Sequence, residues 1–526
     1  MQPDFVRIAS VIEPDASQRA LVADLAKLCD GRATAAPQDR IAYARDLWPK
    51  ATYFAGLGKV PRPPDAICWP ADEAQLGKLV AYARERHIPL IPYGAGSGVC
   101  GGAIALTGGV TVDLKRMDKL LEVDRAALRF TCQAGIIGEN LERELATHGL
   151  SLGHFPSSIY CSTLGGWLAA RSAGQCSTKY GKIEDMCASL TAVLGTGEIV
   201  KVGGRPARGA DLAQLLIGSE GTLGFITQAS LYAVPAPAEL VYRAVRFRTL
   251  ESGAEAIRRI LRDGLRPAVV RLYDPFDTVI AGKGGKPHFE ATDSQHRDGI
   301  QVIQERAPLA ARLAIRAALG RPAALNHIAD LLRECLLVLV FEGDGELASA
   351  EDEQALILCR ELGGVDLGAS PARHWMEQRY AVSYKQSKMF AAGAFADTME
   401  VAATWDRVLP VYRAVRKAVA PLGFIMAHLS HAYVEGCSLY FTFSATAASP
   451  EACAERYDAL WREALGAAMG AGATVSHHHG IGFWKAARLH EELGSAGVHA
   501  LQALKRTCDP DGILNPGKLG LGAEAA

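Results

Sequence analysis

The chain has 526 residues, of which 49% are hydrophobic and 21% are charged, and its net charge is −1. This composition is typical of a globular protein with a substantial core in two or more domains, and it excludes a disordered chain. Because there is no basic surplus, nucleic acid and anionic membranes are not expected as partners.

We expect a cytoplasmic protein without a transmembrane segment. The first residues, MQPDFVRIAS, include Asp4 and lack the apolar segment of a signal peptide. No stretch reaches the roughly 18 consecutive apolar residues of a membrane span. The 12 cysteines are scattered without a C-x-x-C pair, a pattern that indicates neither a zinc ribbon nor a disulfide framework.

The first elements follow a proline-marked boundary. Residues 1–58 are predicted to be mostly helical, and the prolines between 61 and 70 end that region. Apolar residues at helical spacing predict an amphipathic helix over 71–87, with Leu76, Val80 and Ala83 on one face. A short buried strand over 88–92 comes next, and residues 108–114 alternate as a strand does.

The glycine-rich loop between these two strands contains Gly96-Ser97-Gly98-Val99-Cys100-Gly101, which matches G-x-G-x-x-G. A Rossmann fingerprint needs a helix directly after the glycines, because that helix's N-terminus faces the pyrophosphate. Here the helix precedes the strand, so we predict that this is not a Rossmann turn. The glycine amides can still cradle phosphate oxygens as a nest; the alternative is a β turn that binds nothing.

Further along the chain, strands are predicted at 129–135, 190–195 and 198–202, and a helix at 139–150. VPAPAE at 234–239 marks a domain boundary. After it, strands and helices alternate in an α+β pattern, and the loop 281–288 with helices around 300–333 reads as an insertion. The predicted segments are an N-terminal helical region (1–58), an FAD-binding domain (59–236), a cap or substrate domain (237–475) and a C-terminal segment returning to the flavin site (476–526).

Motifs in this order resemble those of the vanillyl-alcohol oxidase superfamily. STLGGW, RSAG, YGKIED, GSEGTLG, ATWDRV, LYFTF and SHHHGIG together are similar to the alkyldihydroxyacetonephosphate synthase branch and its bacterial relatives, over about residues 60–518. The ending NPGKLG is more similar to FAD-linked D-2-hydroxy-acid dehydrogenases. The resemblance implies an α+β fold, with a two-part FAD-binding domain of the vanillyl-alcohol oxidase type (a PCMH-type domain) and an α+β cap domain.

The resemblance also implies which residues contact FAD. They are Pro92, Tyr93, Gly94, Ala95, Gly96, Ser97, Gly98, Pro156, Ser157, Ser162, Ala169, Ala170, Arg171, Ser172, Glu220, Gly221, Thr222, Leu223, Gly224 and Ile226. Some members of the superfamily tether FAD covalently through histidine or cysteine. Ser97 stands where the tethering histidine is expected, and neither Cys100 nor Cys161 is placed for a tether, so we predict non-covalent FAD.

The candidate catalytic residues are Tyr440 and the triple histidine His477, His478 and His479. An imidazole titrates near pH 6.5 and can shuttle a proton beside a flavin. If the three residues were extended, His477 and His479 would share one face and His478 the other. In the synthase family the tyrosine matching Tyr440 is the acid/base group; packing in the strand core and a polar cluster supporting a loop are the alternative roles.

No metal is expected. The related dehydrogenases complete a divalent metal site with a pair of histidines in the region that here contains His428 and His431. The position similar to the second ligand is Tyr440, and the loss of one nitrogen ligand should weaken such a site sharply.

Substrate identity depends on the stretch QRYAVSYKQSKM. The synthase family has a phosphate-holding arginine there, and our alignment places Gln386 at that position, with Lys385, Lys388 and Arg379 nearby. Glutamine cannot form the bidentate, charged pair that a phosphate favours. The candidate substrate-binding residues are therefore Gln386, Lys385 and Arg379.

Three functions remain open. The first is an FAD-dependent oxidoreductase that oxidises a small hydroxy acid or alcohol by hydride transfer to flavin N5. The second is an alkyldihydroxyacetonephosphate synthase, which makes ether lipid without net redox change through a flavin N5 adduct. The third is a non-catalytic FAD-binding scaffold. The partners expected are a small-molecule substrate and an electron acceptor that the sequence does not identify, and a homodimer is carried as a hypothesis.

Overall fold

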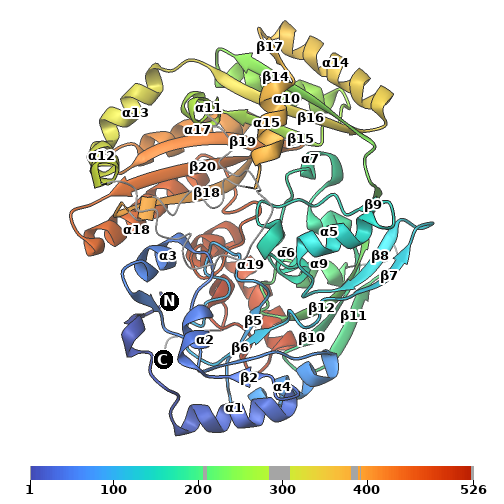
Figure 1. The fold of residues 1–526 in the computed structure, drawn as a ribbon, viewed down its shortest axis with the longest axis vertical. Coiled ribbons are helices and arrows are strands. Elements are labelled where there is room, and N and C mark those ends of the chain that lie inside the picture. Colours follow the sequence, from blue (N-terminus) through green and yellow to red (C-terminus); the bar gives the residue numbers. More distant parts are fainter. Residues whose placement is uncertain (1, 205–209, 283–308, 381–388, 391, 523–526) are drawn as a thin grey trace, which may run out of the picture. The chain divides into compact units, whose positions relative to one another are not determined.

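The computed structural model describes residues 2–204, 210–282, 309–380, 389–390 and 392–522. Two units divide the chain (Figure 1). The first consists of Met1–Ala238, Glu400–Ala402 and Thr474–Ala526, and the second of Glu239–Met399 and Ala403–Ala473. The N-terminal region and the C-terminal segment, which the sequence analysis separates, therefore both belong to the first unit.

One sheet of the first unit carries the glycine loop. Its strand order is β2 (Ala33–Thr34), β4 (Ala66–Cys68), β6 (Val110–Asp113) and β5 (Leu90–Tyr93), and β6 runs parallel to both β4 and β5. Helix α4 (Glu73–Glu85) begins at the N-cap Asp72, whose side chain accepts a hydrogen bond from the Gln75 amide. Its predicted apolar face is confirmed.

The core under this sheet joins distant parts of the chain. Side chains of α1 (Ala16–Leu28) and α4 cluster with those of β4, β6 and β5, and Ile513 and Leu514 from the C-terminal segment belong to the same cluster. Burial of each such leucine or isoleucine contributes about 1.5–3 kcal/mol. The C-terminal segment is thus built into the core of the first unit.

A second, antiparallel sheet completes this unit. Its strand order is β11 (Ile199–Gly203), β10 (Cys187–Leu194), β12 (Gly224–Tyr232), β8 (Arg129–Gln133) and β7 (Leu120–Asp124). The predicted strands in this region are confirmed. The remaining elements of the unit are β1 (Phe5–Arg7), α2 (Pro37–Ala42), α3 (Pro49–Ala55), β3 (Lys59–Pro61), α5 (Gly138–Ala146), β9 (Leu150–Ser151), α6 (Leu164–Ala170), α7 (Ser177–Tyr180), α8 (Ile183–Met186), α9 (Leu212–Leu216), β13 (Val234–Pro235) and α19 (Ala486–Cys508).

The second unit is built on one seven-stranded sheet. Its strand order is β17 (Val365–Gly368), β14 (Glu239–Phe247), β16 (Cys335–Gly343), β15 (Val269–Tyr273), β19 (Phe424–Ala432), β20 (Gly436–Thr446) and β18 (Ala394–Thr404). The first eight residues of β16 are buried, as its continuous apolar run predicts. Its helices are α10 (Leu250–Arg262), α11 (Pro275–Gly282), α12 (Leu309–Leu319), α13 (Pro322–Leu331), α14 (Gly345–Glu361), α15 (Ser370–Gln378), α17 (Trp405–Val419) and α18 (Pro450–Gly470).

Two of these helices, α12 and α13, confirm the helices expected around 300–333, whereas most of the loop 281–288 lies outside the described residues. No described helix combines the length and the apolar character that a membrane crossing requires.

Candidate active site

The glycine loop leaves the end of β5 and leads into β6 without a helix, which confirms that it is not a Rossmann turn. Two of its glycines have no room for a side chain. A Cβ at Gly94 would lie 2.3 Å from Thr163 Oγ1, and one at Gly96, where φ is +64°, would lie 2.1 Å from Tyr93 Oη. The sequence GAG is therefore required by close packing and by a left-handed backbone.

The loop presents a row of backbone donors. The amides of Gly94 to Val99 have no hydrogen-bond acceptor within the part of the chain that the structure describes. Buried backbone N–H groups are almost always paired; these residues are partly buried or exposed, so their amides are open to a ligand or to water. Successive amides of this kind form a concave anion-binding nest, so this loop fits the diphosphate of a dinucleotide.

The second predicted stretch packs directly on the loop. Thr163, which fills the space beside Gly94, is also the N-cap of α6, where its hydroxyl accepts from the Gly166 amide. At the other end of α6, Arg171 adopts φ +52° and donates to the Gln214 carbonyl. Ser172 follows, 3.2 Å from His154 Nε2.

Glu220 connects the third stretch to the histidine loop. Its backbone amide donates to the Ala169 carbonyl, and its carboxylate accepts from the amides of Ile481 (2.5 Å) and Gly482 (2.8 Å). Burial raises the pKa of this carboxyl, while the two amide bonds oppose that shift.

Asn515 of the NPGKLG segment adds a further link. Its side-chain amide donates to the carbonyls of Gly102 (3.0 Å) and Glu220 (2.7 Å). A Cβ at Gly482 would lie 1.9 Å from the Cys100 carbonyl oxygen, so the histidine loop touches the glycine loop directly. The fold thus gathers five sequence-distant motifs in the first unit, which contains every residue predicted to contact FAD.

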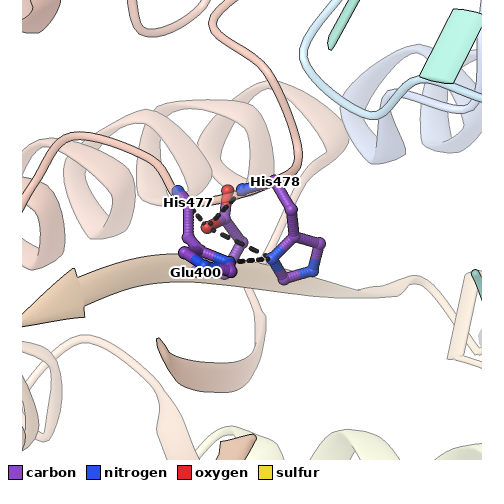
Figure 2. A group of neighbouring side chains, drawn as sticks. All are labelled: Glu400, His477 and His478. Atoms are coloured by element: carbon purple, nitrogen blue, oxygen red, sulfur yellow. Dashed lines mark hydrogen bonds and ion pairs between the residues drawn. The ribbon is translucent and has the colours of Figure 1, made fainter. Parts of the chain in front are cut away.

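The triple histidine lies in a bent loop beside Glu400 of β18, and Figure 2 shows His477 and His478 next to the Glu400 carboxylate. One oxygen, Oε1, accepts from Ser476 Oγ (2.5 Å), the His479 amide (2.9 Å) and Lys485 Nζ (3.2 Å). The other, Oε2, accepts from the amides of His477 (2.5 Å) and His478 (3.1 Å). The backbone bends around the carboxylate, so the three histidines are not extended and the alternation of faces in an extended segment does not apply to them.

The imidazoles contact one another in sequence. His477 Nδ1 lies 3.1 Å from His478 Nδ1, and the rings of His478 and His479 meet edge to face at 4.6 Å. Burial, assisted by Lys182, lowers the pKa of His477 to about 4, and burial lowers that of His479 to about 4 against the attraction of Glu400. Both rings are therefore neutral at pH 7.

Glu400 is ionised. Burial alone would raise its pKa, but Lys485 and the three histidines hold the pKa well below its usual range. Burial likewise disfavours the Lys485 ammonium, and Glu400 more than offsets this, so the Lys485 pKa is raised. Glu400, His477 and His478 place potential ligand atoms within 4.8 Å of one another, a spacing that a metal ion could bridge.

Tyr440 belongs to the second unit, on β20. It is partly buried and faces His428 across the β19–β20 pair, with the two rings stacked at 4.8 Å and 14°. His428 Nδ1 lies 3.0 Å from Asp277 Oδ2. Burial keeps the pKa of His428 well below normal and raises that of Asp277 to about 7, so the imidazole is neutral at pH 7 and the carboxyl changes its charge near that pH.

Of the substrate-site candidates, Lys385 and Gln386 lie outside the described residues, as does Lys388. Arg379 follows α15. Its guanidinium donates to the Met376 carbonyl (2.8 Å) and lies over the Tyr380 ring at 4.5 Å.

Sequence reasoning missed four charged or titratable residues of the first unit: Asp46, His154, Glu400 and Lys518. All four are at most 1% exposed. His154 stands in the apolar context LGHFP, and Lys518 lies in the NPGKLG motif, so a polar residue within an otherwise buried segment was the available signal. Glu400 shares its strand with a second buried acid, Asp397, and nothing in the sequence indicates that Glu400 is the one that bonds to the histidine loop.

Comparison with known proteins gives consistent similarities. Residues 64–203 match the family model of the FAD binding domain, and residues 236–519 match that of the FAD linked oxidases, C-terminal domain. The chain is 30% identical over 471 residues to the alkyldihydroxyacetonephosphate synthase of Caenorhabditis elegans, covering 87% of this chain and 76% of the relative.

A second relative is the glycolate oxidase subunit GlcD of Bacillus subtilis (strain 168), 26% identical over 467 residues, covering 87% of this chain and 89% of the relative. A solved structure of an alkyldihydroxyacetonephosphate synthase is also similar. It has a TM-score of 0.76 and 25% identity, and the match covers 98% of this chain and 88% of that structure's chain.

Proposed function

The chain belongs to the family of FAD-linked oxidases, and we propose that it is an oxidoreductase that removes a hydride from a small hydroxy acid or alcohol. The family confirms the predicted cofactor, FAD, and the expectation of an enzyme. Together with the similar solved structure it confirms the α+β fold of the vanillyl-alcohol oxidase type. The scaffold alternative is thereby set aside.

The observation that carries the proposal is the meeting of an amide-lined nest with a histidine loop in one unit. The nest between Gly94 and Val99 fits the FAD diphosphate, and Gly482 seats the histidine loop against Cys100 of the same glycine loop. Bound FAD accepts a hydride, which is the redox chemistry that side chains cannot supply. What remains for the protein is to orient the substrate and remove its hydroxyl proton.

The histidine loop is suited to the proton step. Neutral imidazoles can accept a proton, and both His477 and His479 are neutral at pH 7 because burial lowers their pKa values. We assign proton removal to this loop, with Tyr440 as the second acid/base group of the proposal. A positioned acid/base group typically contributes about 10²–10⁴ in rate.

We infer the substrate class from Gln386. A phosphodianion needs a charged, bidentate partner, which glutamine cannot provide. Arg379 is engaged with the Met376 carbonyl and the Tyr380 ring. We therefore propose a substrate without a phosphate at this end, with a carboxylate paired to Lys385 or Lys388.

The second candidate is ether-lipid synthesis. It is favoured by Tyr440, which stands where the dehydrogenases carry a histidine, and by the similarity to alkyldihydroxyacetonephosphate synthases. Ether-lipid synthesis requires a cationic side chain to bind the substrate phosphate, and the neutral Gln386 does not provide one.

A dye-linked survey tests the proposed function. The purified protein is assayed for reduction of dichlorophenolindophenol with 2-hydroxy acids, sugar acids and primary or secondary alcohols. We expect turnover with at least one carboxylate-bearing alcohol and none with its O-methyl ether, which has no hydroxyl proton to remove. Dye reduction by none of these compounds would contradict the proposal.

A further inference from the structure

Two carboxylates, the fully buried one of Glu400 and the partly buried one of Glu220, hold the backbone of the histidine loop. Glu400 accepts from the consecutive amides of His477, His478 and His479, and Glu220 accepts from those of Ile481 and Gly482. Five amides in six residues are thus bonded to side chains from other parts of the chain. Because each such bond to a charged group contributes about 1.5–3 kcal/mol, the loop has little freedom to move.

The hydrogen bonds that Glu400 already accepts indicate whether the cluster of Figure 2 can bind a metal ion. The two carboxylate oxygens of Glu400 already accept five hydrogen bonds, including one from the Lys485 ammonium. The side chains of Glu400 and Lys485 are fully buried. A metal ion bound to Glu400 and the two histidines would have to displace these donors and lie close to an ammonium group. The geometry is therefore that of a carboxylate that holds the backbone of the histidine loop in place, and not that of a metal ligand.

The same carboxylate bears on the proton of one imidazole. His478 Nδ1 lies 3.6 Å from Glu400 Oε2 and 3.1 Å from His477 Nδ1. In the Nδ1–Nδ1 contact one nitrogen must donate and the other accept. The negative charge of Glu400 favours the hydrogen on His478 Nδ1, so His477 Nδ1 accepts it and His477 carries its own hydrogen on Nε2.

We propose that Glu400 is a positioning residue that fixes the tautomer of His478, with hydrogen on Nδ1, so that Nε2 is the nitrogen that takes the substrate's hydroxyl proton. This inference deepens the proposed function and rests on it for the identity of the proton. Lys485 balances the charge of Glu400 and keeps it ionised, and the three amide bonds keep the imidazoles in place.

Flavin reduction in paired variants tests the coupling. Glu400→Gln and His478→Gln should each slow reduction by the substrate about 10²-fold or more, and the double variant should be no slower than His478→Gln by more than about 3-fold, because both changes remove one function. Glu492→Gln is the matched control: Glu492 also accepts an amide of this segment, from Val475, and its loss should change the rate less than about 2-fold. If the rate loss of the double variant equals the product of the two single losses, the proposal is overturned.

A second readout needs neither activity nor a Glu400 variant. The wild-type holoprotein is labelled with ¹⁵N in its 14 histidines, and the ring nitrogens are observed by NMR, with His477→Gln and His478→Gln used for assignment. We expect His478 in the Nδ1–H form and His477 in the Nε2–H form, both unchanged by one equivalent of Zn²⁺. An Nε2–H form of His478, or a Zn²⁺-dependent shift of both rings, would refute the proposal even if no substrate is found. Failure of the dye assay with the expected tautomers would refute only the proposed function.

Discussion

At the scale of single residues, the first unit concentrates buried charge around the glycine and histidine loops. Burial lowers the pKa of Lys518 to about 7, against the attraction of Asp46 and Glu220, and raises that of Asp46 to about 6. Lys518 donates to the Ile104 carbonyl, and Asp46 accepts from the Trp48 amide. Such groups persist because backbone partners and opposite charges satisfy them, and they fix loops that have no regular secondary structure.

Tyr440 provides the first test at this scale. Tyr440→Phe removes one hydroxyl and keeps the ring that stacks on His428, so FAD content and thermal stability should be retained. The rate of flavin reduction should fall about 10²–10⁴-fold if the hydroxyl transfers a proton. Stopped-flow absorbance measures the rate.

The matched control for that variant is Tyr412→Phe. Tyr412 donates its hydroxyl to Asp274 in the same unit, so its loss should lower stability by about 1 kcal/mol and leave the rate unchanged. Full activity of Tyr440→Phe would place that residue among the packing aromatics.

His154 gives a pH-dependent prediction. Burial lowers its pKa to about 3, whereas in the unfolded chain it titrates near pH 6.5. The unfolded state therefore binds the extra proton between pH 6.5 and about 3, and the stabilisation present above pH 6.5 is lost as the pH falls through this window.

Between pH 7 and pH 5 the loss due to His154 should approach about 2 kcal/mol. Thermal unfolding at both pH values should show a smaller decrease for His154→Gln than for the wild type. Equal decreases in the two proteins would mean that the pKa of His154 is the same in the folded and unfolded states.

At the scale of elements, the loops are determined by what they pack against. The helix at 71–87 could be predicted because its apolar face follows the helical period, and the loop after β5 because a helix precedes the strand. The bend at His477–His479 could not, because it depends on Glu400, which lies 77 residues away from His477 in the chain. The strand carries two buried acids, Asp397 and Glu400, and no sequence pattern indicates the partner of either.

Gly96→Ala tests the glycine loop as an element. The added Cβ would lie 2.1 Å from Tyr93 Oη at φ +64°, so the nest must deform. Left-handed strain of about 1–2 kcal/mol together with this clash should weaken FAD binding about 10-fold or more. The ratio of flavin absorbance to protein after dialysis gives the occupancy.

Gly58→Ala is the control for that experiment, since Gly58 has a similar φ of +74° and no atom within 4 Å of the added Cβ. It should lose some stability and keep its FAD. If both variants retain FAD equally, the amides of the loop are not the diphosphate site.

At the scale of the whole molecule, the order of the sequence motifs along the chain indicates the fold. Their order predicted the FAD-binding fold, and the structure brings the glycine loop, Glu220 and Asn515 into contact although they are distant in sequence. The substrate could not be predicted to the same degree, because our proposal for it depends on a single position, Gln386, and on which neighbouring lysine meets the substrate.

Release of the flavin is a prediction for the whole holoprotein. Ser97 stands where a tethering histidine is expected, so FAD should be held by non-covalent bonds only. Precipitation with trichloroacetic acid should leave a yellow supernatant containing free FAD and a colourless pellet. A pellet that keeps its colour would demonstrate a covalent tether.

The most direct test of the oxidoreductase assignment is flavin absorbance near about 450 nm, followed anaerobically without any electron acceptor. A hydroxy acid or alcohol that is active in the dye assay should bleach one flavin per protein in a single phase. Under the same conditions an acylated dihydroxyacetone phosphate with a fatty alcohol should yield no ether product. Ether formation by the unmodified protein, with no bleaching by any hydroxy acid or alcohol, would contradict the account and assign the chain to ether-lipid synthesis.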